Sequence, residues 1–301
     1  MRQMRSEHGQ ATVLFAISAV ALLSMGALSL DAGRAYVLVQ QLKTAADAAA
    51  LAGGQDLPSN PVQASVDAQA TAAANGVQSA DVTVSVGQSN QTITVTTTGT
   101  VPYYFAPLFG VDSGTFSQTS VVEVGPQSQL QGAVPLGVFE QPFVYGQTYT
   151  LKAGAGGGGC GNYMALDLNG SSDGNGDNGA SQYETNLEDG YPQTMTIGDG
   201  VPTETGDMVG PTDTGLKTRQ SSDPNSNYQT VLPTSPRVLY LPIISPSDCG
   251  KSSVTILGFA AFYLQSVNGG DVTGQFMHLV VDGQFGSSAG DYGLEAERLI
   301  Q

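Results

Sequence analysis

The feature that most constrains this chain is an uncharged stretch over residues 11–30, which is apolar apart from one threonine and three serines. As a helix rising about 1.5 Å per residue, this stretch is about 30 Å long, which matches the hydrocarbon core of a bilayer. A cleavable signal peptide is the alternative, but its apolar stretch is usually about 7 to 15 residues long and a small-residue cleavage site follows it. Because a helical pattern continues beyond residue 30, we predict a retained transmembrane anchor over 11–30.

The charge distribution indicates the orientation of this anchor. The formal net charge is −16, yet the first ten residues carry +1, because Arg2 and Arg5 outnumber Glu7, and the remainder carries −17. Basic flanks stay on the cytoplasmic side of a spanning helix. We therefore expect residues 1–10 to form a cytoplasmic tail and the bulk of the chain to lie outside. The same acidic balance argues against a nucleic-acid partner, which would require clustered Lys and Arg.

A helical pattern continues directly from the anchor. Small and apolar residues recur at three- and four-residue spacing from Ala32 to Ala50, and Gly53 with Gly54 then ends the helix. Anchor and extension together predict one rod about 65 Å long. The Ala-rich surface over 44–54 allows helices to approach closely. We predict that similar rods of other subunits pack against it.

Two charged residues, Asp31 and Arg34, follow the anchor immediately. Their spacing of three places both on one face of a helix, and charged residues at this depth are typical of the outer edge of a membrane. We interpret them as an interfacial pair that sets the depth of the anchor, rather than as residues with a chemical role.

The next part of the sequence predicts a short helix. Asn60 is a suitable N-cap, Pro61 suits the first helical turn, and Gly76 closes the helix.

Antiparallel strands are predicted after this helix. Alternation with period two runs over 82–86 and 93–96, which indicates a β-hairpin. The aromatic run 102–110 contains two prolines and interrupts the pattern, and 115–124 predicts a third strand. We therefore expect a helix-plus-antiparallel-sheet domain over 31–125.

A composition shift separates this domain from the rest of the chain. Residues 126–142 contain several Gly, Pro and Gln, so we predict a linker or crossing segment there. Residues 143–301 predict a mostly-β domain with long loops and one short helix at 180–189, which makes the fold class α+β. The strand candidates are 143–152, 163–168, 237–244, 253–267 and 272–282, and the intervening Gly-, Pro-, Asp- and Ser-rich text is predicted to be loop.

Two stretches resemble the Tad proteins of the Flp pilus assembly and secretion system. The anchor with DAGRAYVLVQQLKTAADAAALAG, at 31–53, resembles the N-terminal segment of TadG-like proteins. GNYMALDL at 161–168, residues 189–212 and PRVLYLPII at 236–244 resemble the exported part of longer TadG/TadE-like proteins.

The resemblance implies a non-enzymatic, pilin-like component of the Flp/Tad pilus assembly or secretion apparatus. It implies a single-pass protein of the bacterial cytoplasmic membrane, a pilin-like domain over 31–125, and other pilin-like or Tad subunits as partners. The alternative is an anchored extracytoplasmic binding or adhesive protein. Related pilins are cut after a Gly with Glu at the fifth following position. Gly9 is the candidate here, but Leu14 stands in place of Glu, which argues against processing.

The sequence offers little for catalysis. His8 lies at the cytoplasmic edge, and His278, the other histidine, falls in an alternating strand where a structural role is more common. The phosphate-binding GxxxxGK[ST] run and the HExxH and CxxC motifs do not occur in the sequence. A hydrolase built on two carboxylates stays open, because 26 Asp and Glu residues are spread along the chain. We predict no catalytic residue, and no cofactor apart from the calcium considered below.

The only two cysteines, Cys160 and Cys249, both fall in the exported part of the chain. Oxidising compartments favour pairing of such cysteines. We predict a disulfide between them, with two free thiols as the alternative.

The loop 173–184 has the spacing of a calcium-binding loop. Asp173, Asn175, Asp177 and Glu184 occupy positions one, three, five and twelve of an EF-hand-like loop and offer hard oxygen ligands. Position six is Asn178 rather than Gly, and the preceding text predicts a strand rather than a helix. We predict a calcium site at these four residues. The more common alternative is a solvated turn that leads into helix 180–189.

Overall fold

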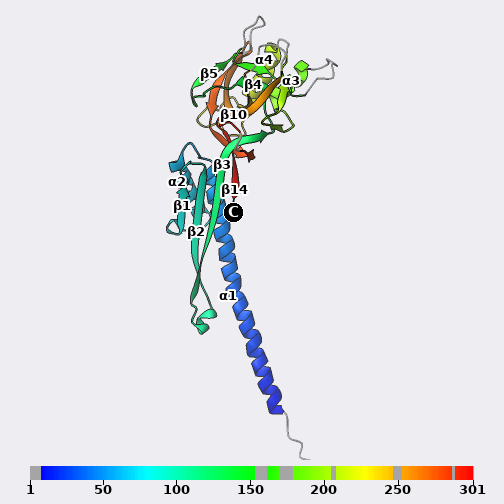
Figure 1. The fold of residues 1–301 in the computed structure, drawn as a ribbon. Coiled ribbons are helices and arrows are strands. Elements are labelled where there is room, and N and C mark those ends of the chain that lie inside the picture. The colour runs from blue at the N-terminus through cyan, green and yellow to red at the C-terminus, as the bar shows by residue number, and fades with distance from the viewer. Residues whose placement is uncertain are drawn as a thin grey trace, which may run out of the picture.

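One long helix, α1 (His8–Gly54), forms a stalk from which the rest of the molecule extends (Figure 1). The computed structural model describes residues 8–152, 161–169, 179–204, 208–246, 253–286 and 289–300. Among these residues, α1 is the one helix long and apolar enough to cross a membrane, and its most apolar window has a mean hydropathy of 2.3 with none of that window buried. The helix confirms the predicted rod and its end at Gly54.

The second half of α1 packs against a short helix, α2 (Pro61–Ala74). This helix begins as predicted, since the side chain of Asn60 accepts a hydrogen bond from the amide of Gln63 at 3.2 Å. Alanines make the contact from both sides. Those fully buried in this cluster are Ala45, Ala49, Ala50, Ala64, Ala68 and Ala72.

The Ala-rich face of α1 was predicted to receive rods of other subunits, and this prediction is wrong for its buried part. From Leu42 to Ala50 that face is covered by the chain's own α2 and sheet. Small side chains do allow a close approach here, as expected, but the helix that approaches belongs to the same chain.

The first sheet lies along the upper part of α1 and confirms the predicted hairpin and third strand. Its strands are β1 (Val82–Val86), β2 (Thr92–Pro102), β3 (Ser113–Leu130), β14 (Leu294–Ile300) and β12 (Leu279–Asp282), in the order β1-β2-β3-β14-β12, with β13 (Gln284–Phe285) and β7 (Met195–Thr196) also paired to β3. A 3-10 turn, η1 (Ser79–Asp81), precedes β1. No strand was predicted from sequence over β14. This strand places residues 294–300 between β3 and β12.

One face of this sheet is apolar and packs on α1, as the alternation of its strands requires. Ile93, Val95 and Val122 are fully buried against the helix. The hydroxyl of Thr97 donates to the carbonyl of Leu42 at 2.9 Å. The other face carries paired hydroxyls across β2 and β3, at Thr96–Thr119, Thr98–Ser117 and Thr100–Thr115.

The segment 126–142 was predicted to be a linker or a crossing segment, and the structure contains a crossing segment. Strand β3 continues to Leu130, and β4 (Leu136–Phe139) follows after a short connection. Ala133, Val134 and Leu136 are fully buried. The segment crosses from one sheet to the other, and its side chains form part of the hydrophobic core.

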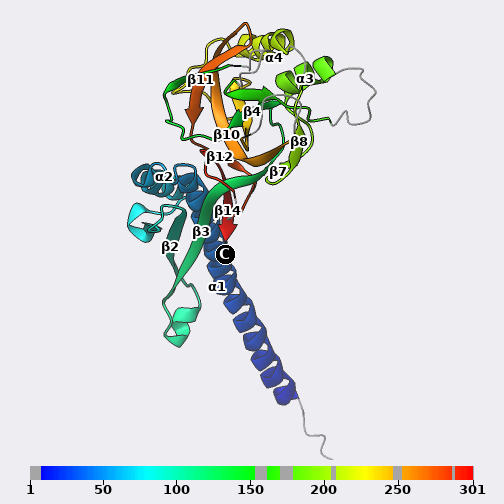
Figure 2. The ribbon, with the colours of Figure 1, turned by 45° about the horizontal axis from the view of Figure 1, so that its top comes forward.

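The second sheet has the order β5-β11-β10-β9-β4-β6, and α3 and α4 lie beside it (Figure 2). Its strands are β5 (Thr148–Leu151), β6 (Tyr163–Ala165), β9 (Val238–Ile244), β10 (Ser253–Asn268) and β11 (Asp271–Met277), and β8 (Gly200–Pro202) pairs with β10. The predicted strand 272–282 is two strands, β11 and β12, which belong to different sheets.

Helix α3 (Gly179–Asp189) confirms the predicted short helix, whereas α4 (Val209–Ser222) replaces a predicted loop. Gly and Pro in α4 give it a low intrinsic propensity, but its buried Leu216 packs in the same core cluster as Leu187 of α3. A Cβ at Gly215 would lie 3.1 Å from the backbone oxygen of Glu184, so the glycine permits this close approach. Tertiary packing therefore overrides the local signal.

The close contact between α1 and α2 can be tested at Gly53. A Cβ at this position would lie 2.7 Å from the backbone oxygen of Ala64, an atom that cannot move aside without shifting α2. We expect Gly53→Ala to lower the free energy of unfolding by roughly 1–3 kcal/mol. At Gly33, where a Cβ meets nothing within 4 Å, the same substitution should leave stability unchanged or raise it by up to about 1 kcal/mol. Denaturation of the full chain in detergent compares the two, and equal stabilities would contradict the packing described.

Candidate functional site at the C-terminal end of the apolar stretch

The hairpin between β2 and β3 ends in a loop that contacts α1 just past the apolar stretch. This hairpin tip, residues 102–112, contains the 3-10 turn η2 (Ala106–Phe109). Asp31 of α1 is only 2% exposed, and its carboxylate accepts hydrogen bonds from three consecutive amides of the tip. The distances are 2.7 Å from Tyr104, 2.9 Å from Phe105 and 2.8 Å from Ala106. A carboxylate facing the amides at the start of a helical turn is a favourable arrangement.

Arg34 makes a second contact with the same tip. Its Nη1 donates to the carbonyl of Pro102 at 2.8 Å, and its guanidinium carbon lies 4.0 Å from the centre of the Tyr104 ring. Asp31 and Arg34 were interpreted as an interfacial pair that sets the depth of the anchor, and this stays a prediction. In the structure both residues bind the hairpin tip, and no ion pair of the described residues joins them directly. The two residues together are called the clamp below.

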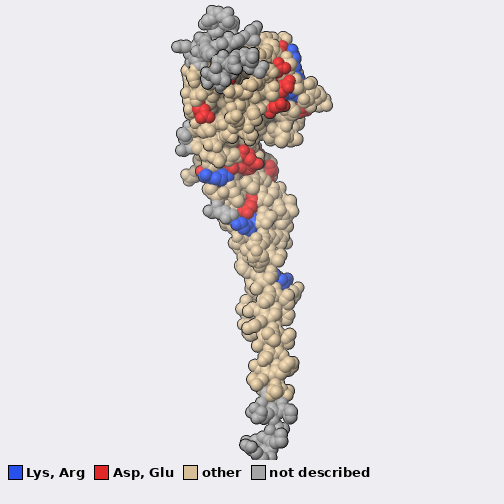
Figure 3. All heavy atoms as spheres, turned by 90° about the vertical axis from the view of Figure 1, so that its right-hand side faces the viewer, with Lys and Arg blue, Asp and Glu red and all other residues tan. Residues whose placement is uncertain are grey.

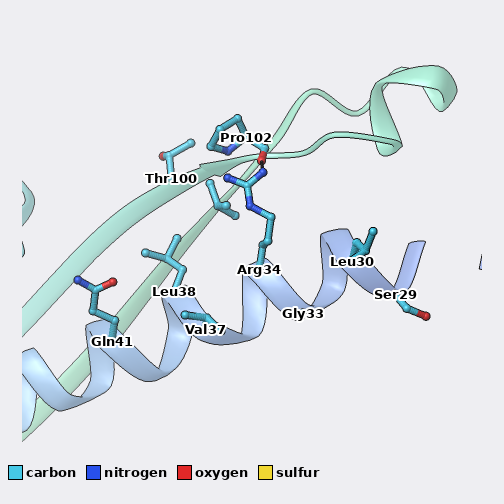
Figure 4. Close-up of a pocket in the computed structure, with 10 residues that line it drawn as sticks. Ser29, Leu30, Gly33, Arg34, Val37, Leu38, Gln41, Thr100 and Pro102 are labelled. Carbon is cyan, nitrogen blue, oxygen red and sulfur yellow. Dashed lines mark hydrogen bonds between the residues drawn. The ribbon is translucent and has the colours of Figure 1, made fainter. Parts of the chain in front are cut away.

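A groove of about 640 Å³ lies between α1 and β2 beside the clamp (Figure 4). Leu30, Val37 and Leu38 line it from the helix, and Val101 and Pro102 line it from the strand. Arg34 is the one charged side chain in its lining, and it points across the groove to the strand. Ser29, Gln41 and Thr100 also line the groove, so its lining is mixed apolar and polar.

The outer surface of the hairpin tip is strongly apolar. Leu108 is 81% exposed and Phe109 is 80% exposed, and Tyr104 and Val111 are also exposed. From sequence, the run 102–110 was predicted only to interrupt the strands. Its lack of alternation and its density of aromatic residues were the signals that it is a separate apolar surface.

A second group of functional interest lies at the waist between the two sheets, where Figure 3 shows acidic side chains gathered. Glu295 of β14 is 2% exposed, and its Oε2 has no hydrogen-bond partner. Burial and the nearby Asp291 raise the pKa of Glu295 to about 8. Burial also raises the pKa of Glu297 on the same strand, although a hydrogen bond from Gln55 at 2.5 Å opposes the change.

The remaining predicted site residues are not assembled by the described structure. Glu184 lies in α3 and is partly buried, whereas its predicted calcium partners Asp173, Asn175 and Asp177 lie outside the described residues. Cys160 and Cys249 also lie outside them. The calcium site and the disulfide stay predictions.

Two further residues of the sequence analysis are placed by the structure. Gly9 lies in the first turn of α1. His278 stacks on Tyr145 with ring centres 3.7 Å apart, and burial lowers its pKa. Among the described residues, no group of three or more His, Cys, Asp or Glu side chains is arranged to hold a metal ion.

The clamp can be tested by removing the charge of Asp31. Asp31→Asn keeps the shape of the side chain, but it replaces one acceptor oxygen by a donor amide and weakens bonds to three amides. A charge-assisted hydrogen bond contributes about 1.5–3 kcal/mol. We expect hydrogen exchange at Tyr104, Phe105 and Ala106 to accelerate by roughly 10- to 100-fold. Asp112→Asn, at the exposed end of the same loop, is the matched control. Unchanged protection in Asp31→Asn would show that the carboxylate does not hold the tip.

The buried Glu295 predicts a pH dependence of stability. Its pKa in the folded protein is about 8, above the usual unfolded value of about 4.3, so the folded state binds a proton more tightly. The corresponding stability is complete below about pH 4 and is lost as the pH rises toward 8. Glu295→Gln should therefore raise the unfolding free energy at pH 8 by roughly 1–3 kcal/mol and change it little at pH 4. Glu123→Gln, a half-exposed carboxyl on β3, is the control, and an equal gain at both pH values for Glu295→Gln would contradict the assignment.

The comparisons with known proteins bear on the same part of the molecule. Residues 9–56 match the family model described as Putative Flp pilus-assembly TadE/G-like. No curated protein and no solved structure matches the chain. The matched segment contains the apolar stretch, the clamp residues and the buried alanines of α1, and it confirms the resemblance drawn from residues 31–53. The chain therefore carries a TadE/G-like Flp pilus-assembly segment that coincides with α1 and its C-terminal turn.

Proposed function

We propose that this protein is a non-enzymatic, pilin-like component of Flp/Tad pilus assembly, held in the bacterial cytoplasmic membrane by residues 11–30. The observation that carries the proposal is the family match over 9–56 and where that segment lies. The first half of α1 is apolar and exposed, and the second half is buried by the chain's own α2 and first sheet. The matched segment is thus both the candidate anchor and the central support of the exported part.

The continuity of α1 supports an assembly role over a tethered binding module. A binding or adhesive domain needs only a flexible connection to its anchor, because its surface must reach a distant target. Here the helix passes from the apolar stretch into the core of the first sheet without a break. Its rotation and tilt are therefore transmitted to both sheets, as is useful for a subunit that docks in a defined geometry.

The proposed orientation places the N-terminus in the cytoplasm and both sheets outside. The net charge of +1 on the first ten residues, against −17 on the remainder, supports this orientation. Residues 11–30 of α1 include no charged residue that would oppose insertion.

A flexible insertion separates the two functional readings. In the source bacterium, loss of this protein should abolish surface Flp pili, and the wild-type chain should restore them. We expect no restoration by a variant with a ten-residue Gly/Ser insertion between Leu30 and Asp31, because the insertion uncouples the sheets from the anchor. The same insertion in the exposed β1–β2 turn, after Asn90, should still restore pili. Pili are counted by electron microscopy.

The controls for this experiment report the anchor separately. A phosphatase that is active only outside the cytoplasm, fused after Gln301, should be active in every variant, which shows insertion and orientation. Normal pili with the insertion at residue 30, but loss of surface binding by the cells, would favour the adhesive alternative and contradict the assembly role.

A further inference from the structure

The apolar surface of the hairpin tip has no role in the fold. None of the residues of η2 is buried, and Leu108 and Phe109 belong to none of the three core clusters. Isolated exposed apolar residues are common on proteins, but a contiguous aromatic and aliphatic surface indicates a contact with a partner or a membrane.

The clamp sets the position of the tip along α1. Asp31 and Arg34, which hold it, are the first charged residues after the apolar stretch 11–30. Figure 4 shows η2 beyond Arg34 and Pro102, at the level of Leu30 and Ser29. The two ribbon views agree that the hairpin extends along α1 toward its N-terminal half. The apolar surface is therefore beside the exposed apolar helix, rather than near the sheets.

Backbone amides of the tip have hydrogen-bond partners within the protein, as contact with lipid requires. Irregular backbone enters lipid only where its amides find partners within the protein. Asp31 binds the amides of Tyr104, Phe105 and Ala106. The amides of Tyr103, Leu108, Gly110 and Val111 donate to carbonyls of the same loop, and the two prolines have no amide hydrogen.

The charge pattern of the tip fits the boundary of a bilayer. Within the tip, residues 102–111 carry no charge, and Asp112 at its end is exposed. Two tyrosines, Tyr103 and Tyr104, stand at the start of the tip, and tyrosine is enriched at membrane interfaces, where its ring is buried and its hydroxyl is wet. Arg34 lies over the Tyr104 ring, where a guanidinium group can also reach lipid phosphates.

We propose that the hairpin tip is a second membrane contact, in which Leu108 and Phe109 enter the outer leaflet beside α1. This inference rests on the proposed anchor over 11–30 and extends it. Two contacts on one rigid body restrict both the tilt and the rotation of α1, which a single helix in a fluid bilayer does not. The clamp is then the device that holds the tip at the correct depth. A second copy of the chain is the competing occupant, and the test below separates it from lipid.

The chain contains no tryptophan, so a single introduced Trp reports on its own surroundings. The full chain is reconstituted in vesicles of phosphatidylethanolamine and phosphatidylglycerol, with bromine placed on the acyl chains as a contact quencher. The test variant is Phe109→Trp. Leu22→Trp reports on the proposed span, and Leu232→Trp reports on an exposed site between α4 and β9. All three positions are exposed in the structure, so none of the substitutions disturbs the core. Circular dichroism confirms that each variant is folded.

We expect Phe109→Trp and Leu22→Trp to emit at shorter wavelength than Leu232→Trp and to be quenched severalfold more strongly by brominated lipid. Adding Asp31→Asn to Phe109→Trp should reduce that quenching, because the clamp is weakened. If Leu22→Trp is quenched and Phe109→Trp is not, the tip does not enter lipid and the inference is overturned while the anchor stands. Short-wavelength emission from Phe109→Trp without quenching by lipid would mean that protein covers the tip, which also overturns it. Absence of quenching at Leu22→Trp would overturn the proposed anchor, and the inference with it.

Discussion

The structure depends on the close packing of small residues where α1 meets α2 and the first sheet. Alanines on both helices and a glycine at the end of α1 bring the backbones together, and β-branched residues of β2 and β3 cover the remaining face. Because the apolar half of α1 is exposed, it is the buried half that packs in the core of the first sheet. The position of the hairpin along α1, and the level at which the clamp holds the hairpin tip, follow from this contact.

Strand β3 connects the first sheet to the second. Its lower part pairs with β2 along the stalk, and its upper part pairs with β14, β13 and β7. The chain then enters the second sheet through a buried crossing segment. Because the chain also returns from β11 of the second sheet to β12 of the first, the two sheets are joined by more than one segment. A force or a tilt applied to one sheet is therefore transmitted to the other.

The two buried acidic features of the molecule differ in how their charge is compensated. Asp31 is a buried carboxylate with three amide donors, an arrangement that stabilises the charge and orders a loop. Glu295 is a buried carboxyl with an unpartnered oxygen, an arrangement that favours the neutral form. The first positions the hairpin tip. The second makes the stability of the junction between the sheets depend on pH. Among the described residues, no hydrogen-bond partner faces the Oε2 atom of Glu295.

The sequence by itself determined the elements whose signals are local. The charge-free stretch, the rod ending at Gly54, the Asn60 cap and the alternating hairpin are all set by composition and period, and the structure contains them. Tertiary structure alone decided three things. Helix α4 forms despite its Gly and Pro because Leu216 is buried against α3, and β14 pairs with β3, which lies roughly 170 to 180 residues earlier along the chain. Asp31 and Arg34 bind a loop 68 to 75 residues away instead of each other. Such contacts depend on which segments are brought to the same level in space, and no periodicity within one segment carries that information.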